Sequence, residues 1–230
     1  MVITIDGPAG TGKSTVAHEV ANRLGFDFLD SGAMYRAVGL AALRRGVNLE
    51  DARELAFVAK HAKIVYDFAK HPPGVLLNGE PVGHHLRSAD ATRAASYVAV
   101  VPAIREMLVA QQQEIGRQRP DLVTEGRDQG SVVFPDAELK FYLDATPQER
   151  ARRRVAQLRA RGEIVDYQEI LNNILARDHR DATRATGPLV VPADAETIDT
   201  TAITQSDVIE RIVAAAAERR GAGRAAETTP

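Results

Sequence analysis

Residues 2–14 read VITIDGPAGTGKS, a short run of β-branched residues that leads directly into a glycine-rich loop. From Gly7 to Ser14 the sequence matches G-x-x-x-x-G-K-[ST], in which glycines let backbone N–H groups surround phosphate oxygens. Apolar side chains then recur at helical spacing through residues 14–24, and a helix N-terminus adds its dipole to an anion site. A buried strand, the loop and a helix in this order predict a site for a nucleoside triphosphate.

Individual residues of this loop have distinct chemical roles. The Lys13 ammonium is long enough to reach the β- and γ-phosphates as a point charge, and the Ser14 hydroxyl suits Mg²⁺. We expect the triphosphate to contact nine consecutive residues: Gly7, Pro8, Ala9, Gly10, Thr11, Gly12, Lys13, Ser14 and Thr15. The loop alone does not say what the triphosphate is used for.

The composition limits the classes of function. The chain has 230 residues with 29 basic and 31 acidic side chains, so its net charge of −2 argues against nucleic acid as a partner. It contains no Cys, which excludes disulfides, thiolate metal sites and thiol nucleophiles. The sequence shows no leader-peptide pattern and no apolar run near the ~18 residues of a membrane span, so we expect a cytoplasmic protein with no membrane partner. Of the 29 basic residues 24 are Arg, whose planar fork of donors suits phosphates.

Short apolar runs alternate with helical patterns along the chain, which predicts a parallel sheet with helices on both faces. The strands expected in this sheet are residues 2–6, 26–30, 121–125, 139–145 and 196–200. Residues 63–85 differ, because their apolar runs include the tight-turn signal Asn78-Gly79 and predict a small antiparallel sheet. From Gly221 onward the chain lacks apolar periodicity, which predicts a flexible tail.

Two polar clusters follow strands of the expected parallel sheet. Residues 30–36 read DSGAMYR and residues 125–131 read EGRDQGS, and each offers a carboxylate, an Arg and a hydroxyl beside glycines. The carboxyl ends of parallel strands lie at one edge, where open sheets bind ligands, so Arg36 and Arg127 are expected to hold a second phosphate facing the first. No Asn-Lys pair occurs, which excludes the base-reading motif of a GTPase. The pattern favours a small phosphotransferase and leaves open a module that binds ATP without transfer.

Four segments together resemble the bacterial cytidylate kinases: GPAGTGKST (7–15), DSGAMYR (30–36), EGRDQGSVVFPDA (125–137) and RDHRDATRA (177–185). The similarity runs from Val2 to about Ala217. It implies an α/β fold of the P-loop nucleoside monophosphate kinase type, with a five-stranded parallel sheet. It also implies ATP and CMP or dCMP as substrates, Mg²⁺ as cofactor, and a monomer.

The resemblance also implies how the chain is divided. A single kinase domain is expected over residues 1–220, followed by a flexible tail over 221–230. Within the domain, the family's monophosphate-binding insertion, with its small antiparallel sheet, corresponds to about 31–100. A mobile lid corresponds to about 150–165.

The resemblance assigns roles residue by residue. The residues matched to the CMP site are Ser31, Tyr35, Arg36, Ser96, Arg105, Arg127, Asp128, Arg177, Asp181 and Arg184. Those matched to cytosine recognition are Ser96, Arg105 and Asp128. Those matched to the sugar are Arg177 and Asp181, and those matched to the acceptor phosphate are Arg127 and Arg184. The expected catalytic residues are Lys13, Arg127, Arg180 and Arg184, and Arg154 is expected to join the ATP site.

A metal role is expected for two residues. Ser14 is matched to the Mg²⁺ ligand, with Glu125 acting on the ion through water. Glu125 stands where relatives often have Asp, and the added methylene is tolerable if the carboxylate acts through water.

Some neighbouring residues are expected to have no functional role. For Arg150, Arg152 and Arg159 a solvated helix face is expected, and Phe57 and Phe141 are expected in the core. An alternative activity remains at this point, which is a kinase for UMP or a small alcohol. An alcohol acceptor requires a base, for which Asp128 is the candidate.

Overall fold

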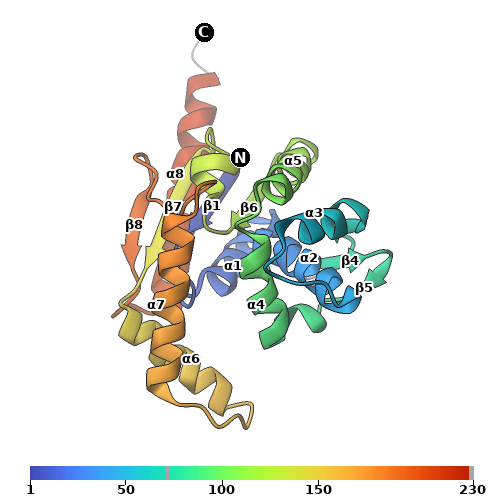
Figure 1. Cartoon of the computed structure of the whole chain (residues 1–230). Coiled ribbons are helices and arrows are strands. Elements are labelled where there is room, and N and C mark those ends of the chain that lie inside the picture. The colour runs from blue at the N-terminus through green and yellow to red at the C-terminus, as the bar shows by residue number, and fades with distance from the viewer. Residues whose placement is uncertain (71–72, 228–230) are drawn as a thin grey trace.

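The computed structural model describes residues 1–70 and 73–227, and its centre is a sheet of five parallel strands (Figure 1). In spatial order the strands are β2 (Asp27–Asp30), β6 (Leu122–Glu125), β1 (Val2–Asp6), β7 (Leu139–Asp144) and β8 (Glu196–Asp199). All five predicted strands form, and the predicted fold class is confirmed. Because β1 is the middle strand, the loop that follows it leaves from the centre of the sheet edge.

Strand β1 shows how the two faces of the sheet are used. Ile3 and Ile5 are fully buried in one hydrophobic core, while Thr4 and Asp6 alternate with them and face the other side. The helices that pack on the isoleucine face are α1 (Lys13–Leu24) and α8 (Gln205–Glu227). A short π-helical turn (Gln129–Val133) covers the other face at β1, and α5 (Pro102–Gln118) packs on that turn. Asp6 at the end of β1 therefore lies on the face that the π-helical turn covers.

A second core is built from the chain inserted between β2 and β6. Its helices, besides α5, are α2 (Ser31–Arg45), α3 (Ala52–His61) and α4 (Ala89–Val98). Its antiparallel strands are β3 (Ile64–Asp67), β4 (Gly74–Leu77) and β5 (Glu80–Pro81), which confirms the predicted small sheet. Asn78 and Gly79 at its turn have φ of 52° and 85°, as a two-residue hairpin of this type requires.

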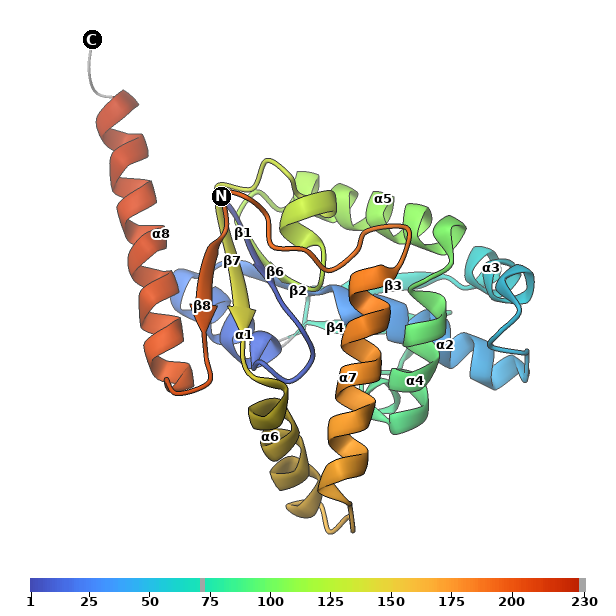
Figure 2. The same ribbon diagram turned by 60° about the vertical axis from the view of Figure 1, so that its left-hand side comes forward.

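Helices α6 (Pro147–Arg159) and α7 (Tyr167–Thr183) form an antiparallel pair that projects from the sheet (Figures 1 and 2). The Thr146 hydroxyl caps α6 by accepting the Glu149 N–H at 3.3 Å, and Asp166 caps α7 by accepting the Glu169 N–H at 2.8 Å. The segment expected to be a lid, residues 150–165, takes in most of α6 and the connection to α7. Its opening and closing remain a prediction.

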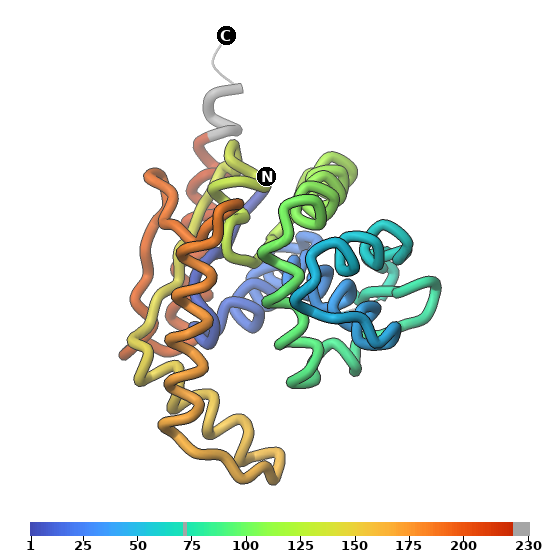
Figure 3. Tube along the Cα trace, in the orientation of Figure 1, coloured from blue at the N-terminus to red at the C-terminus, as the bar shows by residue number. Residues whose placement is uncertain are grey.

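Helix α8, whose described part is the red segment in Figure 3, continues through Glu227, so residues 221–227 of the expected tail are helical. The flexibility of this tail stays a prediction. Among the residues of α8 whose burial is described, which end at Ala222, the last fully buried one is Ala216, and residues 217–222 are exposed. Ala, Arg and Glu are strong helix formers, and the two glycines of this segment, Gly221 and Gly223, cost only about 1 kcal/mol each in a helix. Residues 228–230 of the expected tail lie outside the described residues.

Two further observations complete the fold. Phe141 is buried as expected, but the expectation was wrong for Phe57, which is 60% exposed on α3. Leu55 and Val58 take the buried face of that helix instead. Within the described residues, no helix combines the length and apolar character that crossing a bilayer requires.

Candidate active site

The loop between β1 and α1 has the backbone conformation of an anion-binding turn. Gly7, Gly10 and Gly12 have φ of 142°, 88° and 93°, a region that L side chains rarely adopt. A Cβ on Gly7 would lie 2.0 Å from the Leu143 carbonyl oxygen of β7, so this position has no room for a side chain. The predicted phosphate loop therefore forms, and it sits directly against the neighbouring strand.

Lys13 is buried at the start of α1 and lies back across this loop. Its Nζ donates a hydrogen bond to the Pro8 carbonyl at 2.7 Å. Burial and the positive charge of Arg127 lower the pKa of Lys13 to about 7, while Glu125 acts in the opposite direction. An anion placed beside Lys13 would raise this pKa again, so the site favours a negatively charged ligand.

Ser14 and Glu125 meet beside the loop. The Ser14 hydroxyl donates to Glu125 Oε1 at 2.6 Å, and burial together with the nearby Asp30 charge raises the pKa of Glu125. Hydroxyl and carboxylate oxygens are the hard ligands that Mg²⁺ prefers. The described residues hold no group of three or more His, Cys, Asp or Glu that could bind a metal. This donor set fits an Mg²⁺ ion that takes most of its ligands from phosphate and water.

Asp6 anchors the loop that follows β6. Its two carboxylate oxygens accept the backbone N–H groups of Gln129 at 2.9 Å and Gly130 at 2.7 Å. Asp6 is 1% exposed, and burial raises its pKa to about 6 although both N–H groups act to lower it. Sequence analysis missed this residue. The available signal was an acid at the end of a buried strand, immediately before the phosphate loop.

Arg127, Asp181 and Arg177 form one charged group between the β6 loop and α7. Arg127 Nε donates to Asp181 Oδ2 at 2.9 Å, and Arg177 Nε lies 3.9 Å from the same oxygen, beyond hydrogen-bond range. Burial and the Arg127 charge lower the pKa of Arg177 to about 10. The structure thus brings together two arginines predicted for the acceptor and the acid predicted to accompany them.

Arg105, Asp128 and Arg184 form a second charged group, deeper in the site. Arg105 Nη2 donates to Asp128 Oδ2, and Arg184 Nη2 lies 3.6 Å from the other Asp128 oxygen. The Arg105 Cζ also lies 5.8 Å from the centre of the Tyr35 ring. Gly187 closes over this pair, since a Cβ there would lie 2.1 Å from Arg105 Nη2. Sequence analysis gave no signal for Gly187.

Several buried guanidinium nitrogens in these two groups have no hydrogen-bond partner in the described part of the chain. They are Arg105 Nε and Nη1, Arg177 Nε and Arg184 Nη2. A buried donor without a partner costs free energy, so such groups are expected where a ligand supplies the acceptors. Because the donors are cationic, the matching ligand is an anion.

The predicted cluster at the end of β2 borders the same edge. Arg36 Nη2 donates to Asp30 Oδ2 at 2.6 Å, and Asp30 Oδ1 caps α2 by accepting the Ala33 N–H at 2.9 Å. The Ser31 hydroxyl donates to the Glu125 carbonyl at 2.7 Å, which ties the ends of β2 and β6 together. Arg36 is thereby oriented from a rigid helix start.

Three predicted residues lie outside these contacts in the described structure. Arg180 is exposed on α7, Arg154 donates to Gln157 at 2.7 Å, and the Ser96 hydroxyl donates to the Thr92 carbonyl at 3.5 Å. Their expected roles toward ligands therefore remain predictions.

Arg150 requires a correction. It was expected on a solvated face, but its side chain is only 3% exposed. Its guanidinium donates to the Ala145 carbonyl at 3.0 Å, to the Ala9 carbonyl at 3.1 Å and to both Asp178 oxygens at 3.1 and 2.6 Å. The first turn of α6 faces the phosphate loop, so this position is buried, whereas Arg152 is 71% exposed as expected.

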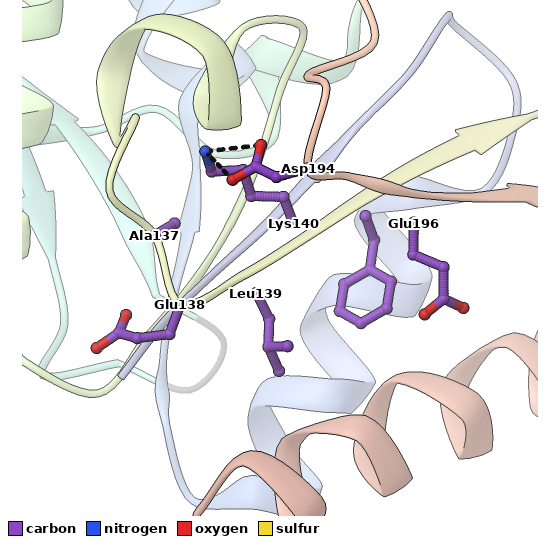
Figure 4. A pocket seen from close by; sticks show the side chains of 7 residues that line it. Ala137, Glu138, Leu139, Lys140, Asp194 and Glu196 are labelled. Carbon is purple, nitrogen blue, oxygen red and sulfur yellow. Dashed lines mark hydrogen bonds and ion pairs between the residues drawn. The ribbon is translucent and has the colours of Figure 1, made fainter. Parts of the chain in front are cut away.

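A separate pocket of about 170 Å³ opens where β7 begins (Figure 4). Lys140 there lies 3.0 and 2.7 Å from the two Asp194 oxygens, and this contact lowers the pKa of Asp194. The amino end of a parallel strand is at the opposite edge from its carboxyl end, where the phosphate loop lies. Because it lies at that opposite edge, the pocket is not part of the candidate site.

Comparison with known proteins agrees with this geometry. The family model for cytidylate kinase matches residues 3–218. A cytidylate kinase of Pelotomaculum thermopropionicum is 48% identical over 223 residues, 96% of each chain. A cytidylate kinase of Stutzerimonas stutzeri is 44% identical over 96% of this chain and 97% of its own. Another, of Rhodococcus jostii, is also 44% identical, over 97% and 98%. These matches confirm the resemblance, and the chain belongs to the cytidylate kinase family.

Proposed function

We propose that this protein transfers the γ-phosphate of ATP to CMP or dCMP, giving ADP and CDP or dCDP. The observation that carries this proposal is the pairing of two anion sites at one sheet edge. The phosphate loop with buried Lys13 is one site. The buried, partly unpartnered guanidinium groups around Asp128 and Asp181 are the other. A module that only binds ATP has no need of the second.

The donor half holds the ATP phosphates. Residues 7–15 offer backbone N–H groups and the α1 N-terminus, and Lys13 supplies the positive charge. Arg154, on the projecting helix pair, joins this half when residues 150–165 close over ATP. Closure also excludes water, which would otherwise compete as the phosphoryl acceptor.

The acceptor half holds the monophosphate. Arg36, Arg127 and Arg184 bind its phosphate, and Arg177 with Asp181 holds the sugar. Cytosine recognition falls to Ser96, Arg105 and Asp128. Arg105 and Asp128 suit a base that presents both acceptor and donor atoms on one edge, because together they offer a guanidinium and a carboxylate.

The chemical step needs placement and charge neutralisation more than proton transfer. The nucleophile is a phosphate oxygen of the acceptor, which is already ionised at pH 7, so no general base is required. Two unit negative charges 4 Å apart repel by about 4 kcal/mol at an effective dielectric near 20. Lys13, Arg127, Arg180 and Arg184 offset this repulsion. Ser14 and Glu125, together with phosphate oxygens, would hold Mg²⁺, which would supply further positive charge at the triphosphate.

The proposal is tested by measuring ADP release with a panel of acceptors. The assay uses the full-length protein with ATP, Mg²⁺ and, separately, CMP, dCMP, UMP, AMP and shikimate. We expect CMP and dCMP to give the highest kcat/KM. A preference for AMP or shikimate would overturn the proposal, and so would ATP binding without transfer to any nucleotide.

A further inference from the structure

The Arg150 guanidinium joins three segments that are distant in sequence. It donates to Ala145 at the end of β7, to Ala9 in the phosphate loop and to Asp178 on α7. Four of its five N–H donors are used, two of them on Nη1. Its Cβ also packs against the loop, because a Cβ built on Gly10 would lie 3.1 Å from it.

The Asp178 contact is bidentate and mostly shielded from water. The two N–H···O distances are 3.1 and 2.6 Å, and the side-chain exposures are 3% for Arg150 and 22% for Asp178. A buried guanidinium is costly unless it is fully paired, and the parallel two-bond geometry fixes orientation as well as distance. This pair therefore sets where α7 lies relative to the phosphate loop.

Helix α7 is also held from a second direction. Asp181 accepts from Arg127 at 2.9 Å, and Asp178 lies three residues earlier on the same helix. Residues three apart point about 60° apart around a helix, so α7 is held by contacts on two different sides. The contacts at Asp178 and Asp181 together define its rotation and its height. The same helix and its C-cap carry Arg177 and Arg184, which face the acceptor half.

We propose that Arg150 and Asp178 are a positioning pair that aligns the donor phosphates with the arginines of α7. The pair touches neither substrate, and it acts through the Ala9 carbonyl on one side and α7 on the other. This inference rests on the proposed phosphoryl transfer. In-line transfer is sensitive to placement, and a 1 Å shift can cost about 100-fold in rate.

The kinetic test uses Asp178→Asn, Arg150→Lys and the double variant in the full-length protein. Arg150→Lys keeps the charge but loses the two-bond fork, and Arg152→Lys is the matched exposed control. We expect kcat to fall by roughly 30- to 100-fold in each single variant, with both KM values changed less than about threefold. The double variant should be no slower than the slower single variant, because both remove the same contact. The exposed control should keep wild-type kcat.

A second readout does not depend on which acceptor the enzyme uses. The chain has no Cys, so Asn22→Cys on α1 and Leu175→Cys on α7, both exposed, accept spin labels without background. We expect a narrow distance distribution between the labels with Asp178 present and a broader or shifted one with Asp178→Asn. Unfolding curves of the labelled proteins check that both are folded.

The outcomes separate the two proposals. An unchanged label distance, or a kcat within threefold of wild type in folded Asp178→Asn, overturns the positioning role. A fall in kcat matched by an equal rise in both KM values, with additive effects in the double variant, also overturns it. If wild type does not phosphorylate CMP but the label distance shifts with Asp178→Asn, the pair still positions α7 and the proposed function fails instead.

Discussion

The Asp6 carboxylate accepts the backbone N–H of Gly130 at 2.7 Å, although 124 residues separate the two along the chain. Its other oxygen accepts the Gln129 N–H. Strand β1, which leads into the phosphate loop, is thereby tied to the loop that carries Arg127 and Asp128. One buried carboxylate thus fixes the phosphate loop relative to the loop that carries Arg127 and Asp128.

Replacing Asp6 by Asn should misplace the acceptor loop. An amide offers one acceptor oxygen and turns an N–H toward the second backbone donor, which leaves a buried N–H unpaired at a cost of about 1–3 kcal/mol. We expect kcat/KM for CMP to fall at least about tenfold in a steady-state ADP-release assay. Asp90→Asn, at an exposed acid, is the control. Equal activity of the two variants would contradict the anchoring role.

Asp6 should also leave a signature in stability against pH. Its folded pKa of about 6 lies above its ordinary value of 3.8, so the folded protein binds this proton more tightly. Binding of this proton therefore stabilises the folded protein fully below about pH 4, and the stabilisation is lost as the pH rises through 6. From pH 7 to pH 5, wild type should gain about 1 kcal/mol relative to Asp6→Asn. Urea unfolding at both pH values measures this, and a constant difference would exclude it.

Lys13→Met should separate activity from stability. We expect turnover to fall by roughly 10³-fold or more, because the charge beside the transferred phosphate is lost. The free energy of unfolding at pH 7 should not fall, because burial already disfavours the ammonium, as its lowered pKa of about 7 shows. Lys60→Met, at an exposed lysine on α3, is the control for both measurements. Near-wild-type turnover in Lys13→Met would refute the assigned role.

Arg184→Ala should lower turnover far more than ATP affinity. Arg184 lies 3.6 Å from Asp128 in the acceptor half, while Asp128 keeps its contact with Arg105. We expect kcat with CMP to fall by about 10²-fold or more, and the Kd for ATP from calorimetry to change less than about threefold. Arg93→Ala, at an exposed arginine, should change neither quantity. A defect confined to ATP binding would move Arg184 to the donor half.

Glu125→Gln should weaken the affinity of the enzyme for Mg²⁺. Loss of a supporting carboxylate typically costs about 10- to 100-fold in metal affinity. The Mg²⁺ concentration for half-maximal activity should therefore rise by at least about tenfold. Glu125→Asp, which keeps the charge, should restore most of the affinity. An unchanged Mg²⁺ titration for Glu125→Gln would place Glu125 outside the metal site.

The local spacing of residue types was sufficient to predict much of the fold and part of the candidate site. The phosphate loop, the parallel strands, the small antiparallel sheet and the polar clusters after β2 and β6 depend on short-range spacing and on glycine conformations. The rule that parallel strands share a carboxyl edge then places those clusters together. Apolar periodicity did not indicate the helix over residues 221–227, because that periodicity reports burial, whereas strong helix formers can continue a helix along exposed residues.

Long-range contacts required the folded chain. Arg150 looks like one more exposed arginine in a charged helix, and only the packing of α6 on the phosphate loop buries it against Asp178. Asp6 looks like a strand terminus, and its partners lie more than 120 residues away. The residues next to a side chain in the sequence predict whether it lies in a helix or a strand and on which face of that element. The hydrogen-bond partners of a buried charged group depend on how elements distant in the sequence pack together. Such partners must be present, because a buried charge without one costs too much free energy.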